Sequence, residues 1–320
     1  MRLRILALCL TALLPIAPAW AAWPDRPIKL IVPFPPGGPN DAVARLVAEP
    51  LSQQLGQPVV IDNRAGAGGT IGSDAGAKAA PDGYTLTLGS TSSHSLPTLL
   101  KQRIGYSPTT SFAPVGLIGR TPTVLLANIR VPVRDYQELL ALARSQPGKL
   151  TYGSSGVGTL NHLISEYFKA ETGTFLVHIP YRGTGQAMSD LLAGQIDLMF
   201  DAVVTAAPQV KAGKLRALAV SSTQRVPSLP EVPTLDELGL KGFQGSLWVG
   251  LLAPAGTPAA VTERLNRELQ ATLHRPEVRT RMSALGFEPQ PGPASAMVLH
   301  MRAVQDTWAR VINERNIHVD

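Results

Sequence analysis

Apolar runs of strand length alternate with amphipathic segments along most of the chain. Residues 28–34 are almost entirely apolar and predict a buried strand, and residues 35–39, rich in proline and glycine, predict a turn. Asn40 is placed to cap a helix that begins at Asp41. Apolar residues then recur at helical spacing, so a strand, a loop and a helix follow one another here.

The same order returns in the middle of the chain. Residues 150–153 predict the end of a strand, residues 154–158 a loop, and Thr159 the cap of a helix that begins with Leu160. Further strands are predicted at residues 59–62, 84–89, 175–181, 196–200 and 215–221, and further helices at 186–193, from 258 onwards and at 295–312. Strands that alternate with helices indicate an α/β fold with mainly parallel sheets, in which ligands gather at the carboxyl ends of strands.

The length of the chain favours two lobes, because single cores seldom grow beyond ~250–300 residues. Residues 111–128 are apolar without a helical period, so we expect a strand that crosses from one lobe to the other. Residues 227–233 are expected to form the return crossing. The expected division is residues 22–120 and 228–320 for lobe 1 and residues 121–227 for lobe 2.

The first residues carry an export signal. Arg2 and Arg4 precede an apolar run that ends near residue 17, and Ala19-Trp20-Ala21 supplies an A-x-A cleavage pattern. The run is shorter than the ~20 residues that span a bilayer, which argues against a retained membrane anchor. We therefore expect residues 1–21 to be a signal peptide cleaved after Ala21, and the mature protein to lie in the periplasm.

Composition narrows the possible partners. Cys9, the one cysteine, lies in the expected signal peptide, so stability must come from core burial rather than from disulfides. Loss of Arg2 and Arg4 lowers the formal net charge from +6 to +4. The remaining Lys and Arg residues are scattered and form no basic stripe of the kind that nucleic acids require. Nucleic acid is therefore not expected as a partner.

Two glycine-rich loops, residues 35–39 and 154–158, lead into helices. Unpaired backbone N–H groups converge at such helix starts, where the helix dipole is positive, so each loop can bind an anion. A tight turn is the plainer explanation of a single loop. Two loops in equivalent positions of two lobes favour a shared cleft. The chain has no G-x-x-x-x-G-K-[ST] pattern, so no nucleotide cofactor is expected.

Catalytic and metal-binding patterns are not found in the sequence either. Ser154 and Ser155 do not fit the G-x-S-x-G nucleophile elbow, because Val157 stands at the position of the last glycine. The histidines are dispersed and show no metal-ligand spacing. We therefore expect a binding protein without a metal, a cofactor or a catalytic residue.

Polar side chains near the predicted loops are candidates for selectivity. Asp41 stands near a helix start and Asp201 at the end of a predicted strand, where dipole stabilisation and turn capping are the plainer roles. Tyr181 and Arg182 follow another predicted strand, so they either meet an anion or lie on a solvated surface. His162, on the first helical turn, either packs beside the helix start or touches the ligand.

Characteristic segments recur in a fixed order along nearly the whole mature chain. They are V-P-F-P-P-G-G-P-N-D at residues 32–41, N-R-A-G-A-G-G at 63–69, A-P-D-G-Y at 80–84, and the segments at 152–158, 179–183, 197–201, 213–220 and 252–258. Together they resemble the Bug family of tripartite tricarboxylate transporter receptors. The resemblance implies a two-lobed periplasmic-binding-protein fold, a type II-like Venus flytrap with two inter-lobe crossings.

The resemblance also implies that loop amides and bridging waters hold a ligand carboxylate. From the loops and the resemblance together, the residues expected to contact the ligand are Phe34, Pro36, Gly37, Gly38, Asn40, Asp41, Ser90, Thr91, Ser154, Ser155, Gly156, Gly158, Thr159, His162, Tyr181, Arg182 and Asp201. Asn40 departs from the family pattern, which commonly has Ser or Thr at this position, so an amide replaces a hydroxyl there.

The implied ligand is a small carboxylate: a dicarboxylate, a tricarboxylate, an acidic amino acid or an aromatic acid. A receptor of this kind is expected to be monomeric and to deliver its ligand to membrane transporter subunits, or to a sensor where no transporter takes part. A periplasmic hydrolase that uses Ser154 or Ser155 is the rival function. A sensory or scaffold module with a vestigial cleft is a third.

Overall fold

The computed structural model describes residues 23–318, so the expected signal peptide lies outside the described residues. The strands are β1 (Ile28–Val32), β2 (Val59–Asn63), β3 (Thr85–Ser90), β4 (Phe112–Asn128), β5 (Thr151–Ser154), β6 (Val177–Pro180), β7 (Leu198–Ala202), β8 (Leu215–Val220), β9 (Ser246–Pro254) and β10 (Glu288–Pro289). The helices are α1 (Pro39–Leu55), α2 (Thr70–Ala77), α3 (Leu96–Leu99), α4 (Tyr136–Ser145), α5 (Leu160–Thr172), α6 (Thr184–Ala193), α7 (Val203–Lys211), α8 (Ala259–His274), α9 (Pro276–Ala284), α10 (Ala294–Glu314), the 3-10 helix η1 (Ala67–Gly69) and the π-helix η2 (Thr91–Ser95).

The strands form one mixed sheet in the order β2-β1-β3-β9-β4-β7-β5-β6, with β8 and β10 also paired to β4. At one end β1 pairs in parallel with β2 and β3, and at the other β5 pairs in parallel with β6 and β7. This is the parallel pairing that alternating strands and helices predict. In the middle, β4 and β9 are antiparallel to each other and to their neighbours. The sequence pattern predicted neither this pairing nor a strand at β9.

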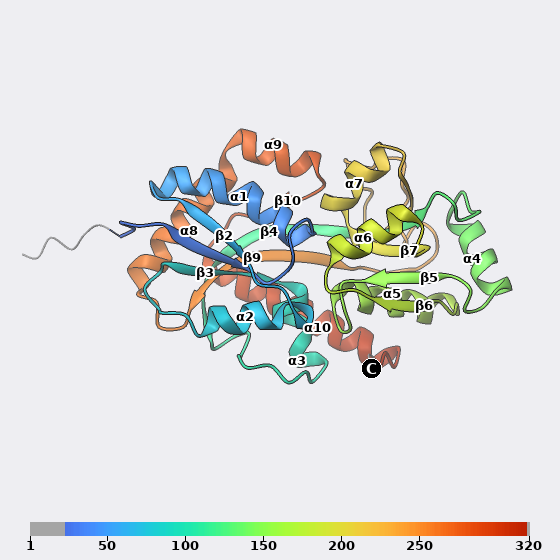
Figure 1. Cartoon of the computed structure of the whole chain (residues 1–320), viewed down its shortest axis with the longest axis horizontal. Helices are drawn as coiled ribbons and strands as arrows, with labels where there is room; N and C mark the ends of the chain where they lie inside the picture. Colours follow the sequence, from blue (N-terminus) through green and yellow to red (C-terminus); the bar gives the residue numbers. More distant parts are fainter. Residues whose placement is uncertain (1–22, 319–320) are drawn as a thin grey trace, which may run out of the picture.

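The long strand β4 belongs to both halves of the molecule. Its residues 112–122 pair with β9, and its residues 123–128 pair with β7 and β8. The strand expected at residues 111–128 is therefore confirmed to within one residue. Figure 1 shows β4 and β9 running through the middle, between a half that holds β1 to β3 and a half that holds β5 to β7.

The segment 227–233, expected to form the return crossing, packs against side chains of the second half. Leu229 and Val232, inside the segment 227–233, pack in the same buried cluster as Val124 of β4. The chain enters β9 only after Gly245, whose carbonyl accepts a hydrogen bond from the backbone N–H of Thr123. We therefore propose that lobe 2 extends to about residue 245 rather than to 227.

Both faces of the sheet are covered where β4 crosses it. Val124 and Leu126 belong to a buried cluster with side chains of α6 and α7, whereas Leu125 and Ala127 belong to a cluster with side chains of α4 and α5. Alternate residues of a strand face opposite sides, so burial on both sides requires a continuous apolar run. The sheet is thus a fixed support for the helices whose starts are described below.

Two helix starts differ in detail from the expectation. Helix α1 begins at Pro39 with Gly38 at the N-cap, so Asn40 lies inside the first turn and does not cap it. Proline suits the first helical position because its missing N–H would have no partner there. Thr159 is the N-cap of α5, as predicted, but its hydroxyl donates to the Gly156 carbonyl instead of accepting from a helix N–H.

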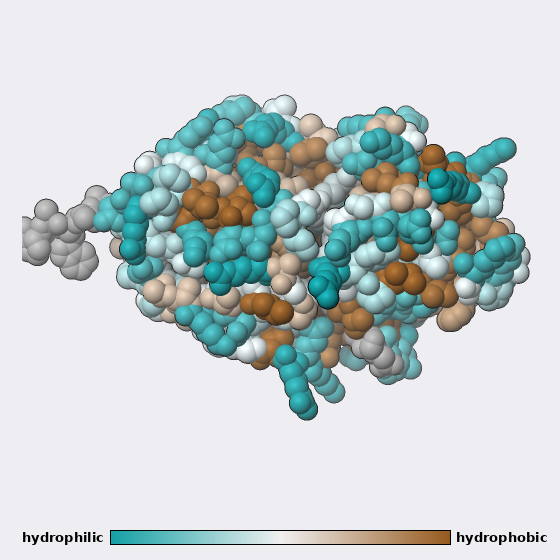
Figure 2. All heavy atoms as spheres, in the orientation of Figure 1, coloured by the Kyte–Doolittle hydropathy of each residue, from teal (hydrophilic) through white to brown (hydrophobic). Residues whose placement is uncertain are grey.

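The surface is mainly polar. Within residues 23–318, no helix combines the length and the apolar composition that crossing a membrane requires. The space-filling view shows polar residues over most of one face, with apolar atoms in separate patches (Figure 2). The large exposed apolar side chains, among them Ile71, Phe175 and Leu299, lie far apart in the sequence.

Candidate functional site

A narrow cleft lies where the two halves meet. Side chains from both halves line it, and they are Phe34, Pro39, Asn40, Ser92, Thr123, Ser155, Leu160, Asn161, Thr184, Ala202 and Leu247. The enclosed space is about 10 Å³, roughly what one water molecule needs. A small acid is much larger than this, so the cleft does not accommodate one in this conformation.

Four helices begin at this cleft. Asn40 is in the first turn of α1, Asn161 in the first turn of α5, Thr184 is the first residue of α6, and Ala202 is the N-cap of α7. Each helix start carries a partial positive charge and N–H groups without helical partners. Their convergence on one small space makes the cleft electrostatically suited to an anion.

Backbone N–H groups at two of these starts are available to a ligand. Within residues 23–318, the backbone N–H groups of Asn40 and Asp41 in α1, and of Asn161 and His162 in α5, have no hydrogen-bond acceptor. The two helices belong to opposite halves of the molecule. An anion between them would therefore receive hydrogen bonds from both halves.

Asp41 holds the first loop and does not line the cleft. Its Oδ2 accepts hydrogen bonds from the Gly37 N–H at 3.0 Å and from Arg45 Nε at 2.9 Å, and its Oδ1 accepts one from Asn63 Nδ2 at 3.0 Å. Burial opposes ionisation, but these hydrogen bonds outweigh it and lower the pKa of Asp41. The carboxylate fixes the shape of the loop before α1. The structure therefore supports a local structural role for Asp41 next to the helix start.

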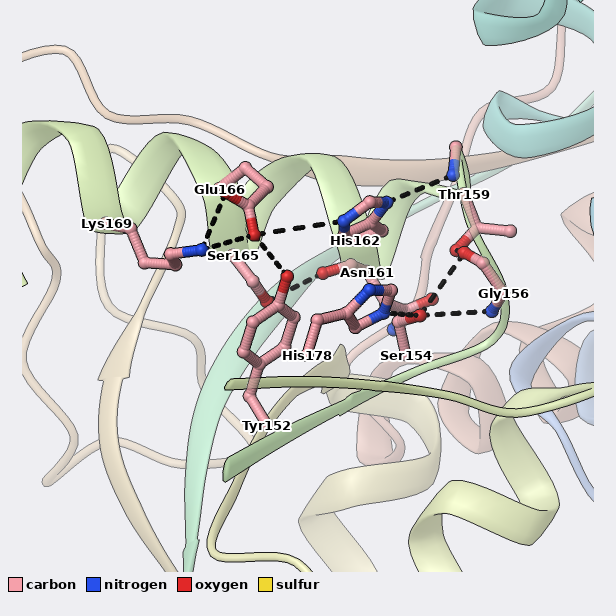
Figure 3. A network of polar contacts seen from close by, with 11 residues as sticks. Tyr152, Ser154, Gly156, Thr159, Asn161, His162, Ser165, Glu166, Lys169 and His178 are labelled. Atoms are coloured by element: carbon pink, nitrogen blue, oxygen red, sulfur yellow. Dashed lines mark hydrogen bonds and ion pairs between the residues drawn. The ribbon is translucent and has the colours of Figure 1, made fainter. Parts of the chain in front are cut away.

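The second loop has a corresponding arrangement. Ser155 Oγ donates to Asn161 Oδ1 at 2.9 Å, and Asn161 Nδ2 donates to the Phe200 carbonyl at 2.6 Å. Both side chains are buried. Ser155 and Asn161 therefore tie the start of α5 to the middle of β7. Ser154, Gly156, Thr159 and His162 lie beside them, outside the cleft lining, in the network of Figure 3.

Of the residues expected to contact ligand, Phe34, Asn40 and Ser155 line the cleft. Pro36, Gly37 and Gly38 form the loop before α1, and Gly158 lies in the loop before α5. None of these four lines the cleft in this conformation. Their contact with ligand stays a prediction.

Ser90 and Thr91 are engaged in the interior of the first half. Ser90 Oγ lies 3.1 Å from Ser93 Oγ. Thr91 Oγ1 donates to the Ser246 carbonyl and accepts from the Trp248 N–H. The next residue, Ser92, is the one that lines the cleft. In the π-helix η2, the successive side chains of Thr91 and Ser92 point in different directions. The position of these residues after a strand does not predict which of them faces the cleft.

Tyr181, Arg182 and Asp201 do not line the cleft. Tyr181 donates its hydroxyl to Asp190 at 2.7 Å, and Arg182 is exposed. Asp201 lies inside β7, not after a strand, and is fully buried. Burial raises the pKa of Asp201 to about 7.

Sequence reasoning missed several cleft residues. Ser92 follows β3 and Thr184 opens α6, so the rule that sites gather at strand ends and helix starts points towards both. Thr123 and Leu247 lie within the crossing strands β4 and β9. Their place in the cleft depends on pairing between distant segments, which no local signal reveals.

Two α/β halves joined by crossing strands, with a cleft of helix starts between them, define a two-lobed solute-binding protein of the Venus flytrap type. Residues 43–317 match the family model described as tripartite tricarboxylate transporter family receptor. The chain belongs to this family. The protein BugT of Bordetella pertussis is 40% identical over 268 residues, which are 83% of this chain and 82% of BugT.

Solved structures agree with this assignment. The periplasmic binding protein BugD has a TM-score of 0.88 and 39% identity, covering 92% of this chain and 99% of BugD. Rhodopseudomonas palustris Rpa4515, solved with adipate, has a TM-score of 0.89 and 36% identity, covering 92% and 99%. MatC from the same organism, solved with malate, has a TM-score of 0.86 and 34% identity, covering 91% and 100%. The fold and the family expected from the sequence are confirmed.

Proposed function

We propose that this protein is a periplasmic receptor that captures a small carboxylate in the cleft between its lobes. The observation that carries the proposal is the convergence of four helix starts on the cleft, two of them with backbone N–H groups free to donate. Such groups recognise a carboxylate without a charged side chain. The site would therefore recognise the carboxylate mainly through hydrogen bonds from backbone N–H groups.

The number of donors suits an affinity useful to a receptor. A hydrogen bond to a charged group contributes about 1.5–3 kcal/mol. The four free N–H groups of α1 and α5 could thus support micromolar binding, about −8 kcal/mol, after ordering and association costs. The relatives solved with adipate and malate, both dicarboxylates, support a ligand of this class. A tricarboxylate, an acidic amino acid or an aromatic acid also carries a carboxylate that these N–H groups could bind.

Capture of the ligand would require an open form, and its release would require a second opening. In the present closed arrangement, Ser92 Oγ accepts the Leu160 N–H at 3.1 Å across the cleft. A ligand that contacts both lobes would shift the population towards closure. The closed form would then dock on membrane transporter subunits. A sensor could use the same closure, with a different membrane partner.

The cellular address is part of the proposal. Residues 1–21 have the pattern of a signal peptide with cleavage after Ala21, which would place the mature protein in the periplasm. We expect the mature receptor to act as a monomer, because one chain supplies both sides of the cleft.

A hydrolase is the weaker candidate. Ser154 Oγ lies 2.7 Å from His178 Nε2, the distance of a nucleophile and its base. Ser154 is, however, fully buried and does not line the cleft. A substrate in the cleft would not reach its hydroxyl, so we assign this pair a different role below.

Calorimetry with malate, adipate, citrate, glutamate and nicotinate tests the proposal. The wild type should bind at least one of them without converting it, and a Thr184→Phe variant, which fills the cleft, should not bind it. Ser189→Phe is the matched control, because Ser189 is exposed on the same helix. Binding that survives in Thr184→Phe would move the site elsewhere, and hydrolysis of an ester or amide of the bound acid would favour the hydrolase.

A further inference from the structure

Three aromatic rings from three elements form a stack beside the α5 loop. The rings of Tyr152 in β5 and His178 in β6 lie 4.8 Å apart between centroids, at 15°. The rings of His178 and His162 in α5 lie 3.9 Å apart, at 11°. Figure 3 shows the three side chains close together. None of them lines the cleft, so the stack has no ligand contact to explain it.

The two histidines are bonded to the loop that precedes α5. His162 Nδ1 accepts the Gly158 N–H at 3.1 Å. His178 Nε2 lies 2.7 Å from Ser154 Oγ, which in turn accepts the Gly156 N–H at 3.1 Å. Gly156 and Gly158 have φ of 126° and 72°, a backbone region that glycine tolerates best. The histidines thus hold the two loop amides that the unusual backbone leaves without helical partners.

The bond to Gly158 determines where His162 carries its proton. A ring nitrogen that accepts a hydrogen bond cannot be protonated, so His162 is neutral with its hydrogen on Nε2. That nitrogen faces Glu166 Oε1 at 3.8 Å. Glu166 also accepts the Tyr152 hydroxyl and both of its oxygens accept Lys169 Nζ, at 2.7 and 2.8 Å. Lys169 offsets the carboxylate charge that would otherwise favour an imidazolium.

The surroundings of His162 and His178 favour the neutral form of both rings. Burial lowers the pKa of His162, with Glu166 opposing and Lys169 assisting. Burial, followed by the neighbouring His162, lowers the pKa of His178 to about 4. Two rings stacked at 3.9 Å could not both be charged without strong repulsion.

We propose that His162 is a positioning residue: stacked on His178 and protonated only on Nε2, it fixes the α5 loop so that the Asn161 and His162 backbone N–H groups point at the ligand carboxylate. The inference rests on the proposed carboxylate site and adds the residue that shapes it. The Ser154–His178 pair then serves the same loop, and no catalytic role is needed for it.

Two variants of His162 separate its bond from its bulk. His162→Phe keeps a ring in the stack but leaves the buried Gly158 N–H without an acceptor, and we expect malate or adipate, whichever the wild type binds, to bind at least about fivefold more weakly. His162→Asn puts an amide oxygen near the position of Nδ1 and should bind within about threefold of wild type. Equal affinity in His162→Phe and wild type, or a greater loss in His162→Asn, would overturn the proposal.

A measurement without ligand keeps the inference separate from the proposed function. In two-bond ¹H–¹⁵N correlation spectra of the wild type at pH 7, His162 should show an unprotonated Nδ1 and a protonated Nε2. A protonated Nδ1 would overturn the inference whatever the protein binds. The expected proton position in a protein that binds no carboxylate would instead refute the proposed function and leave the loop-holding role of His162 in place.

Discussion

Replacing Asp201 by asparagine should change how stability depends on pH. The side chain is fully buried in β7. Oδ2 accepts a hydrogen bond from Thr205 Oγ1 at 2.7 Å, and Oδ1 has no partner within residues 23–318. Burial raises the pKa of Asp201 to about 7, and the hydrogen bonds from Thr205 and from the Ala202 backbone oppose it only in part. Asparagine keeps the shape and one acceptor but cannot ionise.

The magnitude follows from the two pKa values. Between the ordinary value of 3.8 and the folded value of about 7, the folded protein keeps a proton that the unfolded chain has lost. The contribution of Asp201 to stability is therefore fully present below pH 3.8 and is lost as the pH rises through 7. By linkage, the wild type loses about 2–3 kcal/mol between pH 5 and pH 8 through this group alone. In a chain of this size that corresponds to a Tm difference on the order of 5 °C.

Urea unfolding of wild type and Asp201→Asn at pH 5 and pH 8 measures this difference. The other titrating groups are common to both proteins and cancel in the comparison. The variant should gain about 2–3 kcal/mol relative to the wild type on going from pH 5 to pH 8. Parallel pH profiles would refute the reasoning, because they would mean that the carboxylate is ionised or hydrated in the folded protein.

Three further outcomes are expected. A Cβ on Gly183 would come 2.4 Å from Cγ of Pro35 in the opposite lobe. Gly183→Ala should therefore hinder closure and weaken carboxylate binding about tenfold or more in calorimetry, with little change in the Tm of the ligand-free protein. Unchanged affinity would contradict this contact. Ser92→Ala removes the acceptor of the Leu160 N–H and should weaken binding several-fold; small-angle scattering with ligand should show a more open form. Burial lowers the pKa of His94 to about 3, so the contribution of His94 to stability is present above pH 6.5 and falls towards pH 3. Between pH 7 and pH 4, the free energy of unfolding in urea should therefore fall by about 3 kcal/mol less in His94→Gln than in the wild type.

The strands and helices with local signals could be predicted from the sequence. The alternation at residues 28–63 and 150–172 predicts strand, loop and helix, because each element buries one face and each loop carries its own turn residues. The strand at 111–128 could also be predicted, although its antiparallel partner β9 could not. Pairing between segments more than a hundred residues apart leaves no periodic signal in either one.

The candidate site was predictable at the level of loops rather than of side chains. Glycine and proline before a helix point to the two loops at residues 35–39 and 154–158, and Phe34, Asn40 and Ser155 line the cleft. The side chains of Asp41 and Asp201, singled out for selectivity, are hydrogen-bonded or buried inside the protein in this conformation, so their contact with ligand stays a prediction. Charge and position in the sequence do not reveal the direction of a side chain, which depends on the packing of distant elements.

The most direct test compares a dicarboxylate with its neutral counterpart. Malate and malamide, or adipate and adipamide, have similar shapes but differ in charge, so calorimetry on the mature protein separates recognition of an anion from simple filling of the cleft. The account predicts that the acid binds with micromolar affinity and that the diamide binds at least about a hundredfold more weakly, because helix starts favour negative charge. Equal affinity for acid and diamide would contradict the central claim that converging helix starts form a carboxylate site.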